Sequence, residues 1–376
     1  MIIKILQSKL REGLNIVERI TIKSLTLPIL NNILIKAEKN FLTLFSTNLE
    51  IGISWWGLAK VEEEGEIVVP AKILSSFVGL LNEEPAKLKT EERNLIIETE
   101  RYATKIKCLS PEEFPILPKI STPEMLTVDS SSFCESLNQV VQIPILSSTR
   151  PEISGIYILF QKNLIKLVAT DSFRLGEKKI FLKEPLSLLK EYSLILPQRT
   201  AKEIINIFGE KKNGLKIYLS PNQIIFESQM EETPHPEIQL ISKLIDGEYP
   251  DYQSILPEKF ATQIILNKNE FLNQLRVASV FASKINEVKL KIDIKKERIE
   301  ILSQNPDLGE YRSSLFAKIK GKEIEISFNF RFLIGGLLNI QSSEVILELN
   351  SAEDAAVLKG VDNPSYLYLV MPIKPT

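Results

Sequence analysis

Residues 125–143 read MLTVDSSSFCESLNQVVQI, in which a short run of β-strand character leads directly into an amphipathic helix. The helical part carries apolar side chains at the spacing of one buried helix face: Phe133, Leu137, Val140 and Val141. Ser132, with Glu135 three residues later, has the spacing of a capping box, which predicts the helix start. The stretch therefore predicts a strand followed by a helix that packs one face against the rest of the protein.

The same strand and helix occur three times, so an internal repeat dominates the organisation of the chain. The copies lie at residues 2–6 with 8–20, 125–129 with 131–143, and 263–266 with 268–281. A second strand and helix recur in each copy, at residues 66–70 with 71–81, 192–197 with 198–208, and 323–328 with 329–340. The pattern predicts six helices in three equivalent pairs.

Short segments with alternating or β-branched residues lie between these helices, and turn residues separate them, so they are predicted to be antiparallel strands. Each copy ends in a strand with a proline-bearing exit, around residues 114–118, 249–257 and 371–375. These exits set the expected domain boundaries near residues 122 and 253. We expect an α+β fold of three repeated domains, 1–122, 123–253 and 254–376, each with two helices packed on antiparallel sheet.

The composition is typical of a globular protein with more than one core: 376 residues, of which 44% are hydrophobic and 25% charged. We find no apolar stretch of about 18 residues and no signal-peptide layout, so we expect a cytoplasmic protein without membrane association. The two cysteines, Cys108 and Cys134, have no further cysteine or histidine at ligand spacing. They predict neither a disulfide framework nor a metal site, and are expected to be buried.

The sequence offers no constellation for catalysis or for a bound cofactor. Its single histidine, His235, lies between prolines in a polar loop, and no Gly-rich phosphate-binding loop is present. Residues 169–175 (ATDSFRL) follow an apolar strand and fit either a plain hairpin turn or a functional loop. An enzyme of another class, for instance a hydrolase that uses Asp171 and Arg174, is an alternative that no nucleophile and base support.

Charge is distributed unevenly along the chain. The six predicted helices carry nine basic and five acidic residues, a net charge of +4, whereas the whole chain carries −2. Such a chain would not bind nucleic acid with its entire surface, so any basic surface must be local. The segregation fits a basic helical surface inside an acidic shell, although ordinary solvated helices give the same count.

Motifs in all three copies resemble those of the bacterial sliding clamps, the beta subunits of DNA polymerase III. The first copy contains Leu27-Pro-Ile-Leu-Asn-Asn-Ile-Leu34, Ser46-Thr-Asn-Leu-Glu50 and Val69-Pro-Ala-Lys72. The second contains Arg150-Pro-Glu-Ile-Ser-Gly155, residues 169–175 and Asp246-Gly-Glu-Tyr-Pro-Asp-Tyr252, and the third closes with Val370-Met-Pro-Ile373. The resemblance covers the whole chain, and the joint order of the motifs makes it specific.

The resemblance implies a non-catalytic processivity factor in the bacterial cytoplasm, associated with the nucleoid during replication. Two chains would join head to tail into a closed ring of six domains, with Val280 and Phe281 at the homodimer contact. The helices would line a hole that encircles double-stranded DNA without reading its sequence. The candidates to face DNA are Lys72, Arg150, Arg199 and Lys23, of which Lys23 is offset by one from the matching basic position.

The resemblance also implies an apolar peptide-binding pocket between the second and third domains. It would take linear motifs of the DNA polymerase III catalytic subunit, the clamp loader, other polymerases and repair proteins. The matching positions are Ile153, Thr170, Ser172, Phe173, Arg174, Leu175, Pro250, Ile255, Val370, Met371 and Pro372. Aliphatic, proline and methionine side chains of this kind form an adaptable groove, and nearby polar groups orient a peptide.

Two departures from the family pattern bear on partner preference. Ser172 and Phe173 stand where Gly and His are common, and residues 374–376 differ from the usual ending. A further alternative is a repeat-built scaffold that binds protein partners and never touches DNA, against which the charge segregation argues. Because the chain has no ATP-binding motif, a loader that uses ATP would be a separate protein.

Overall fold

The computed structural model describes residues 1–22, 24, 26–115, 124–186, 188 and 190–374. The expected domain boundary near residue 122 and the basic residue Lys23 lie outside these described residues. The chain forms two compact units, each with its own sheets. One unit comprises Met1–Cys134, Leu186–Leu189 and Arg199–Leu244, and the other comprises Glu135–Pro185, Lys190–Gln198 and Ile245–Thr376. The middle repeat therefore contributes to both units.

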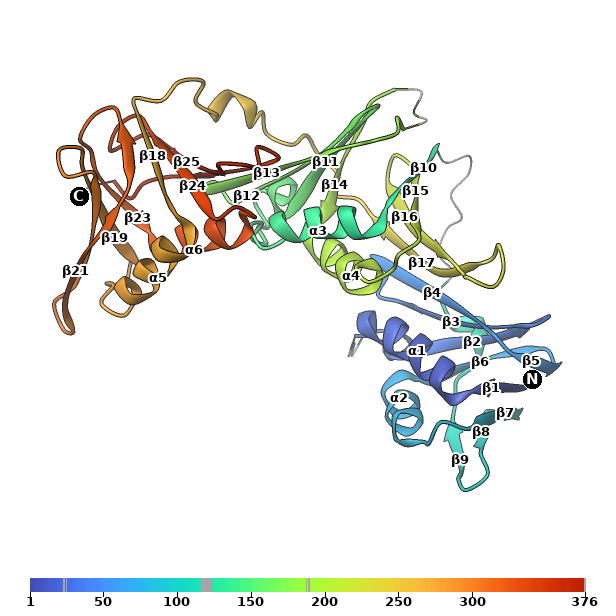
Figure 1. Ribbon diagram of the computed structural model, residues 1–376. Coiled ribbons are helices and arrows are strands. Elements are labelled where there is room, and N and C mark those ends of the chain that lie inside the picture. The colour runs from blue at the N-terminus through green and yellow to red at the C-terminus, as the bar shows by residue number, and fades with distance from the viewer. Residues whose placement is uncertain (23, 25, 116–123, 187, 189, 375–376) are drawn as a thin grey trace. The chain divides into compact units, whose positions relative to one another are not determined.

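The described residues contain six α-helices in three pairs, one pair in each repeat (Figure 1). They are α1 (Gln7–Val17) with α2 (Ala71–Leu80), α3 (Ser130–Val140) with α4 (Gln198–Phe208), and α5 (Lys268–Ser279) with α6 (Phe330–Asn339). Short 3₁₀ helices are η1 (Glu18–Ile20), η2 (Pro28–Asn31), η3 (Pro111–Glu113), η4 (Pro151–Ser154) and η5 (Gln253–Ile255). The six predicted helices are confirmed, with ends that differ by no more than three residues.

The start of α3 differs from the prediction in its capping residue. The carboxylate of Asp129 accepts the backbone N–H of Ser132 at 2.8 Å, so the helix is capped by the residue before it and not by Ser132. The third repeat uses the same position, where Asn267 accepts the N–H of Glu270 at 3.0 Å before α5. The capping-box prediction was therefore wrong, because a better acceptor lies one turn earlier.

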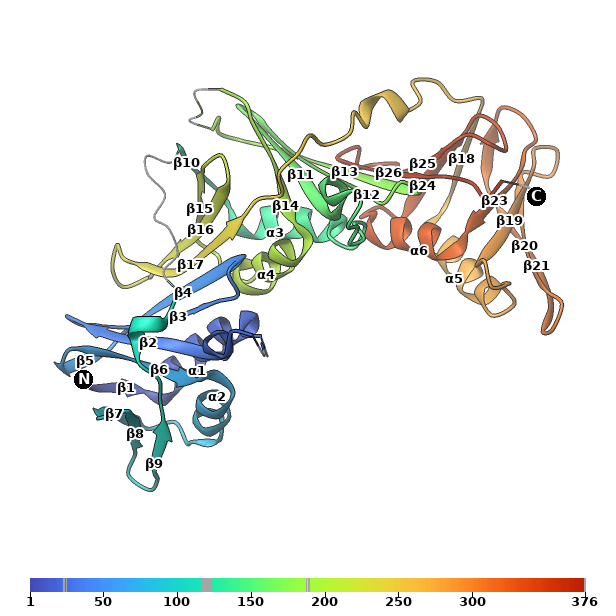
Figure 2. The same ribbon diagram turned by 180° about the vertical axis from the view of Figure 1, so that it is seen from behind.

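Two antiparallel sheets form the unit that contains the first repeat (Figures 1 and 2). In spatial order, the five-stranded sheet is β5 (Lys60–Glu63), β1 (Ile2–Leu6), β7 (Pro85–Glu91), β8 (Asn94–Glu98) and β9 (Ala103–Lys107). The eight-stranded sheet is β10 (Glu124–Asp129), β15 (Gly214–Leu219), β16 (Gln223–Gln229), β17 (Pro236–Lys243), β4 (Ile51–Leu58), β3 (Phe41–Thr47), β2 (Asn32–Glu38) and β6 (Gly65–Pro70). The eight-stranded sheet thus combines strands of the first and second repeats.

Two further antiparallel sheets form the other unit. The nine-stranded sheet is β14 (Tyr192–Pro197), β11 (Gly155–Gln161), β12 (Leu164–Thr170), β13 (Arg174–Phe181), β26 (Tyr366–Val370), β25 (Ala356–Gly360), β24 (Glu344–Leu349), β18 (Thr262–Asn267) and β22 (Lys318–Lys320). The four-stranded sheet is β21 (Gly309–Phe316), β20 (Arg298–Asn305), β19 (Glu287–Asp293) and β23 (Glu325–Asn329). Here the larger sheet combines strands of the second and third repeats.

Neighbouring repeats are thus joined by pairing between strands. At the first seam, β4 of the first repeat pairs with β17 of the second, from Ile51↔Ser242 to Trp55↔Ile238. At the second seam, β13 of the second repeat pairs with β26 of the third. Each seam lies within one compact unit. Continuous backbone hydrogen bonding therefore crosses both junctions between repeats.

The helices bury one face against the sheets, as their apolar spacing predicts. In α1, Leu10 and Leu14 are fully buried. The indole ring of Trp55, on β4, lies so close to Gly13 of α1 and to Gly57 that a side chain at either glycine would collide with it. The helix can approach the sheet this closely only because position 13 has no side chain.

Both cysteines are buried, as predicted, and burial raises the pKa of the Cys108 thiol to about 11. In the described part of the chain, no group of three or more His, Cys, Asp or Glu side chains is arranged to hold a metal ion. No described helix is long and apolar enough to cross a lipid bilayer.

Candidate functional site

The predicted peptide-binding residues gather at one end of the second seam. There β13 and β26 pair antiparallel from Lys178↔Tyr366 to Arg174↔Val370. Beyond Val370, the backbone N–H of Met371 donates to the carbonyl of Phe173 at 2.8 Å. This bond holds the segment after β26 against the turn between β12 and β13.

The turn itself is built around Asp171, whose carboxylate is almost fully buried. One carboxylate oxygen accepts the N–H groups of Phe173 and Arg174, each at 3.0 Å, and the other accepts from Nε of Arg174 at 2.9 Å. Ser172 adopts a left-handed backbone conformation with φ of 74°. The Thr170 hydroxyl donates to the carbonyl of Arg174 at 2.8 Å. These bonds fix the exposed Phe173 at the tip of the turn.

Arg174 links the turn to the third repeat. Its guanidinium carbon lies 4.8 Å from the ring centroid of Phe332 in α6, a cation–π geometry, and Nη2 donates to the carbonyl of Gln142 at 3.2 Å. The ring of Phe173 stacks on Phe332 at 6.5 Å between centroids. Phe173, Arg174 and Phe332 therefore form one aromatic and cationic surface.

Arg150 lies at the other side of the turn. Its guanidinium donates to the Ser172 hydroxyl at 3.3 Å and forms an ion pair with Glu152 at 3.3 Å. In η4, the following 3₁₀ helix, Ile153 is buried. A residue predicted to face DNA thus contacts the candidate peptide surface.

The linker from the second to the third repeat packs against the same sheet. Tyr252 is 6% exposed and its hydroxyl donates to Glu177 at 2.8 Å. Burial, together with this hydrogen bond to a carboxylate, raises the pKa of Tyr252. Tyr157 stacks on Tyr249 at 5.2 Å, and a core cluster that includes Tyr252 joins residues of β12, β13, β25 and β26. The linker therefore covers the strands on both sides of the second seam.

The eleven predicted pocket residues differ in how accessible they are. Ile153, Leu175 and Val370 are buried, and Thr170, Arg174, Pro250 and Pro372 are half-buried. Ser172, Phe173, Ile255 and Met371 are exposed. A ligand would therefore meet mainly the exposed group, while the buried residues hold the surface in position. No pattern in the sequence indicates Phe332, because its contact with Arg174 depends on the pairing of strands far apart in the chain.

The basic residues predicted to face DNA follow the repeat. Lys72 and Arg199 are both exposed, and each is the second residue of its helix, α2 or α4. Arg331 occupies the same position in α6 and is also exposed. The second helix of every repeat thus presents one cationic side chain at an equivalent place in its first turn.

The two predicted dimer residues lie at the C-terminal end of α5. Val280 is 63% exposed, so it is not a core residue. Phe281 is half-buried, and its ring stacks parallel to Tyr311 of β21 at 6.2 Å between centroids. Val280 is thus an exposed apolar residue, and the next residue in the chain packs its ring against β21.

Family profiles of the DNA polymerase III beta subunit match almost the whole chain. The N-terminal domain matches residues 1–118, the central domain 127–251 and the C-terminal domain 253–374. The chain belongs to the DNA polymerase III beta-subunit family. It is accordingly a sliding clamp, a processivity subunit without a catalytic centre. Asp171 and Arg174, considered above as parts of a hydrolase site, serve the hairpin turn and its contact with α6.

Individual relatives are distant in sequence but similar over their full length. The beta sliding clamp of Staphylococcus epidermidis is 26% identical over 359 residues, 93% of each chain. That of Synechococcus elongatus is 26% identical over 375 residues, 98% of each chain. The crystal structure of the DNA polymerase sliding clamp from Bacillus subtilis matches 100% of both chains with a TM-score of 0.93 at 24% identity. The fold of this chain is therefore the three-domain sliding-clamp fold.

Proposed function

We propose that two copies of this chain close head to tail into a ring around double-stranded DNA. The observation that carries this proposal is an exposed basic side chain at the same position of the second helix in all three repeats: Lys72, Arg199 and Arg331. In a closed ring these positions would recur around the hole and meet phosphates without regard to sequence. Weak and sequence-independent contacts of this kind would let the ring slide.

A head-to-tail dimer needs two different apolar surfaces that fit each other. The third repeat offers Val280, which is 63% exposed, and Leu308, which is 64% exposed. The first repeat offers Leu80 at the end of α2, which is 84% exposed. A contact between two copies would cover apolar side chains of this kind, which supports a role for these residues in joining two copies.

The exposed residues at the end of the second seam, around the turn between β12 and β13, form the proposed docking site for partners. Phe173, Ile255 and Met371 are apolar and exposed there, and Arg150 supplies a cation beside them. We assign to this surface the linear motifs of the DNA polymerase III catalytic subunit, the clamp loader, other polymerases and repair proteins. The chain would then work in the bacterial cytoplasm, at the nucleoid during replication.

Retention on DNA tests the ring. The chain is loaded with a bacterial clamp loader and ATP onto nicked circular DNA, half of which is then cut to a linear form. A topological ring stays on circles, runs off linear ends, and sediments at twice the mass of the chain. Equal loss from both forms, or a monomer by sedimentation, would favour a scaffold that does not encircle DNA.

Three variants separate the proposed roles. Lys72→Glu with Arg199→Glu should reduce the slope of log affinity against log salt by about two, since each phosphate contact contributes about 0.9. Val280→Asp should yield monomers. Met371→Lys should weaken peptide binding while the ring stays assembled. Leu175→Lys is not suitable for this last test, because Leu175 is fully buried and its replacement would disturb the core.

A further inference from the structure

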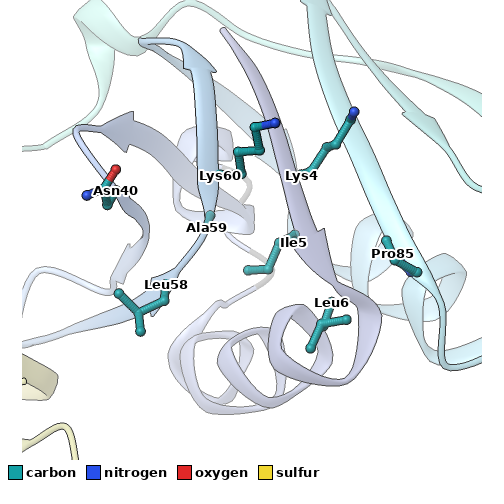
Figure 3. A pocket seen from close by; sticks show the side chains of 8 residues that line it. All are labelled: Lys4, Ile5, Leu6, Asn40, Leu58, Ala59, Lys60 and Pro85. Atoms are coloured by element: carbon teal, nitrogen blue, oxygen red, sulfur yellow. The ribbon is translucent and has the colours of Figure 1, made fainter. Parts of the chain in front are cut away.

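A pocket of about 540 Å³ opens in the first repeat, beside the end of β4 (Figure 3). Ile5 forms its buried floor, and the exposed side chains of Leu6, Leu58 and Pro85 give it apolar walls. Lys4 and Lys60 lie together at one side, with Leu58 and Leu6 toward the other, as Figure 3 shows. The volume is in the range of sites that hold a few side chains of a ligand.

The pocket exists because two sheets part at this place. Along one edge, β1 pairs with β7 over its whole length, but along the other it pairs with β5 only from Ile2 to Lys4. At Ala59 the chain passes from β4 in the eight-stranded sheet to β5 in the five-stranded sheet, and its N–H donates to the carbonyl of Asn40 at 2.9 Å. The edge of β1 beyond Lys4 therefore borders the pocket.

The backbone of Leu6 faces this gap. Gln7 donates its N–H to the carbonyl of Glu84 at 3.1 Å, and the carbonyl of Met1 accepts from Thr90 at 3.0 Å. Odd-numbered residues of β1 thus direct their backbone groups toward β7, and even-numbered residues toward the β5 side, because these groups alternate along a strand. The register with β5 ends at Lys4, so the N–H of Leu6 lies at a strand edge that can accept an added strand.

The two lysines at the pocket are directly opposite each other in the register of β1 with β5. Like charges in this arrangement repel and destabilise the pair of strands. Lys4 is partly neutralised by Glu62 at 3.4 Å, and both lysines are exposed. A carboxylate bound between them would relieve the repulsion, so the charge pattern favours an acidic ligand.

In the third repeat the chain passes from one sheet to the next in the same way, at Ala317, and we call this place the third-repeat corner. It lacks the pair of opposed lysines. Ala317 donates its N–H to the carbonyl of Glu297 at 3.0 Å, as Ala59 does to Asn40, and Phe316 is exposed like Leu58. There, however, Lys318 lies opposite Ile265. The repeated fold thus explains the corner and its exposed apolar residue, but it does not explain two opposed lysines.

We propose that this pocket is a second docking site, which takes an extended acidic and apolar peptide segment of a partner protein. An apolar side chain of the segment packs over Ile5 between Leu6 and Leu58, and flanking carboxylates reach Lys4 and Lys60. A backbone carbonyl of the segment accepts the N–H of Leu6. The apolar floor distinguishes this ligand from a DNA backbone, which offers phosphates alone.

A displayed library of random dodecapeptides, selected on the immobilised full-length chain, tests the proposal. Peptides that also bind a Lys60→Glu variant are discarded, because they bind elsewhere on the chain, for instance at the second seam. The expected survivors carry Asp or Glu on both sides of a large apolar residue. Their affinity, measured by fluorescence anisotropy, should fall about fivefold to tenfold in Lys60→Ala and in Leu58→Ser, as for loss of one contact at a small interface.

The third-repeat corner supplies the matched control. Phe316→Ser and Lys318→Glu change the same backbone site and should leave the affinity of the survivors within twofold of the parent chain. The proposal is overturned if the selection yields no peptides specific for the parent chain, or if Lys60→Glu alters only binding of a labelled DNA duplex. Unchanged thermal unfolding of Lys60→Ala shows that a loss of binding is local. None of these measurements needs a closed ring, so they fail or succeed independently of it.

Discussion

The two seams have the same backbone design and different side chains. Each joins two repeats through one antiparallel pair of strands with five paired positions. At the first seam, apolar residues of the paired strands are buried, and the ion pairs between the repeats lie near the surface. Arg19 pairs with Glu203 at 2.6 Å, and Lys211 lies 3.8 Å from Glu12, while His235 stacks on Phe41 at 4.1 Å.

At the second seam, polar contacts between the repeats are shielded from water. The Gln139 side chain donates to the carbonyl of Asn339 at 2.6 Å, and Lys178, which is 8% exposed, donates to the Ser365 hydroxyl at 2.9 Å. The linker adds Tyr252 over the paired strands. Buried contacts depend little on salt, whereas exposed ion pairs contribute little and are screened. We therefore expect the second seam, which carries the proposed peptide surface, to be the stiffer one.

Tyr252→Ala should have the largest effect on this difference. It removes a buried aromatic ring and leaves Glu177 without its tyrosine partner, which costs about 3–5 kcal/mol. Hydrogen exchange measured by mass spectrometry should become faster in β13 and β26 and stay unchanged in β4 and β17. Tyr252→Phe keeps the ring and should cost about 1 kcal/mol. Equal acceleration at both seams would contradict the assignment of the linker to the second seam alone.

Arg174→Met should have the next largest effect. It leaves the carboxylate of Asp171, whose side chain is 1% exposed, without its cation, and also removes the contact with Phe332. Because Arg174 is itself partly exposed, we expect about 2–3 kcal/mol, less than for a fully buried pair. Adding Asp171→Asn removes the buried charge and should recover part of the loss. A double-mutant cycle measured by denaturant unfolding would give a coupling energy near zero if the pair were unimportant.

Alkaline pH should loosen the second seam selectively. The pKa of Tyr252 is raised in the folded protein by burial and by Glu177, so the folded state holds the phenolic proton more tightly than the unfolded state does. The resulting stabilisation is complete below the ordinary tyrosine pKa of about 10 and is lost as pH rises above it. Exchange of β13 amides, corrected for the intrinsic rate, should therefore depend on pH more steeply in the parent chain than in Tyr252→Phe. If the exchange rates of the parent chain and of Tyr252→Phe depended on pH equally, Tyr252 would not be the titrating group.

His235→Ala tests the first seam and should have a smaller effect. It removes the stack on Phe41 and the edge contact with Trp56 at 5.8 Å, worth about 1 kcal/mol. The chain contains two tryptophans, Trp55 and Trp56, so intrinsic emission reports directly on this place. The emission should shift, and β4 and β17 should exchange faster, while β13 and β26 do not. His235→Phe, which preserves stacking, is the matched control.

How far the sequence predicts these features depends on whether the signal is local. The ends of α4 are predicted without error because the apolar positions Ala201, Ile204 and Phe208 lie within one helix. Neither seam is predicted, since alternation along a strand indicates which face is buried but not which distant strand lies beside it. The same limit hides the opposed lysines Lys4 and Lys60, whose pairing includes a register shift between Ile2 and Ile3. The gathering of the peptide-surface residues was expected from the family resemblance alone.

Arg19→Ala should have the smallest effect, and its dependence on salt is the informative part. Side chains of Arg19 and Glu203 are 37% and 14% exposed, so the pair is worth less than about 1 kcal/mol despite its short distance of 2.6 Å. In low salt the variant should open the first seam slightly more often than the parent chain does, and at about 1 M salt, where the screening length is about 3 Å, the two should be equal. The second seam should respond to neither change. If salt loosened both seams alike, burial would not be what distinguishes them, and the shared strand pairing would be the controlling feature.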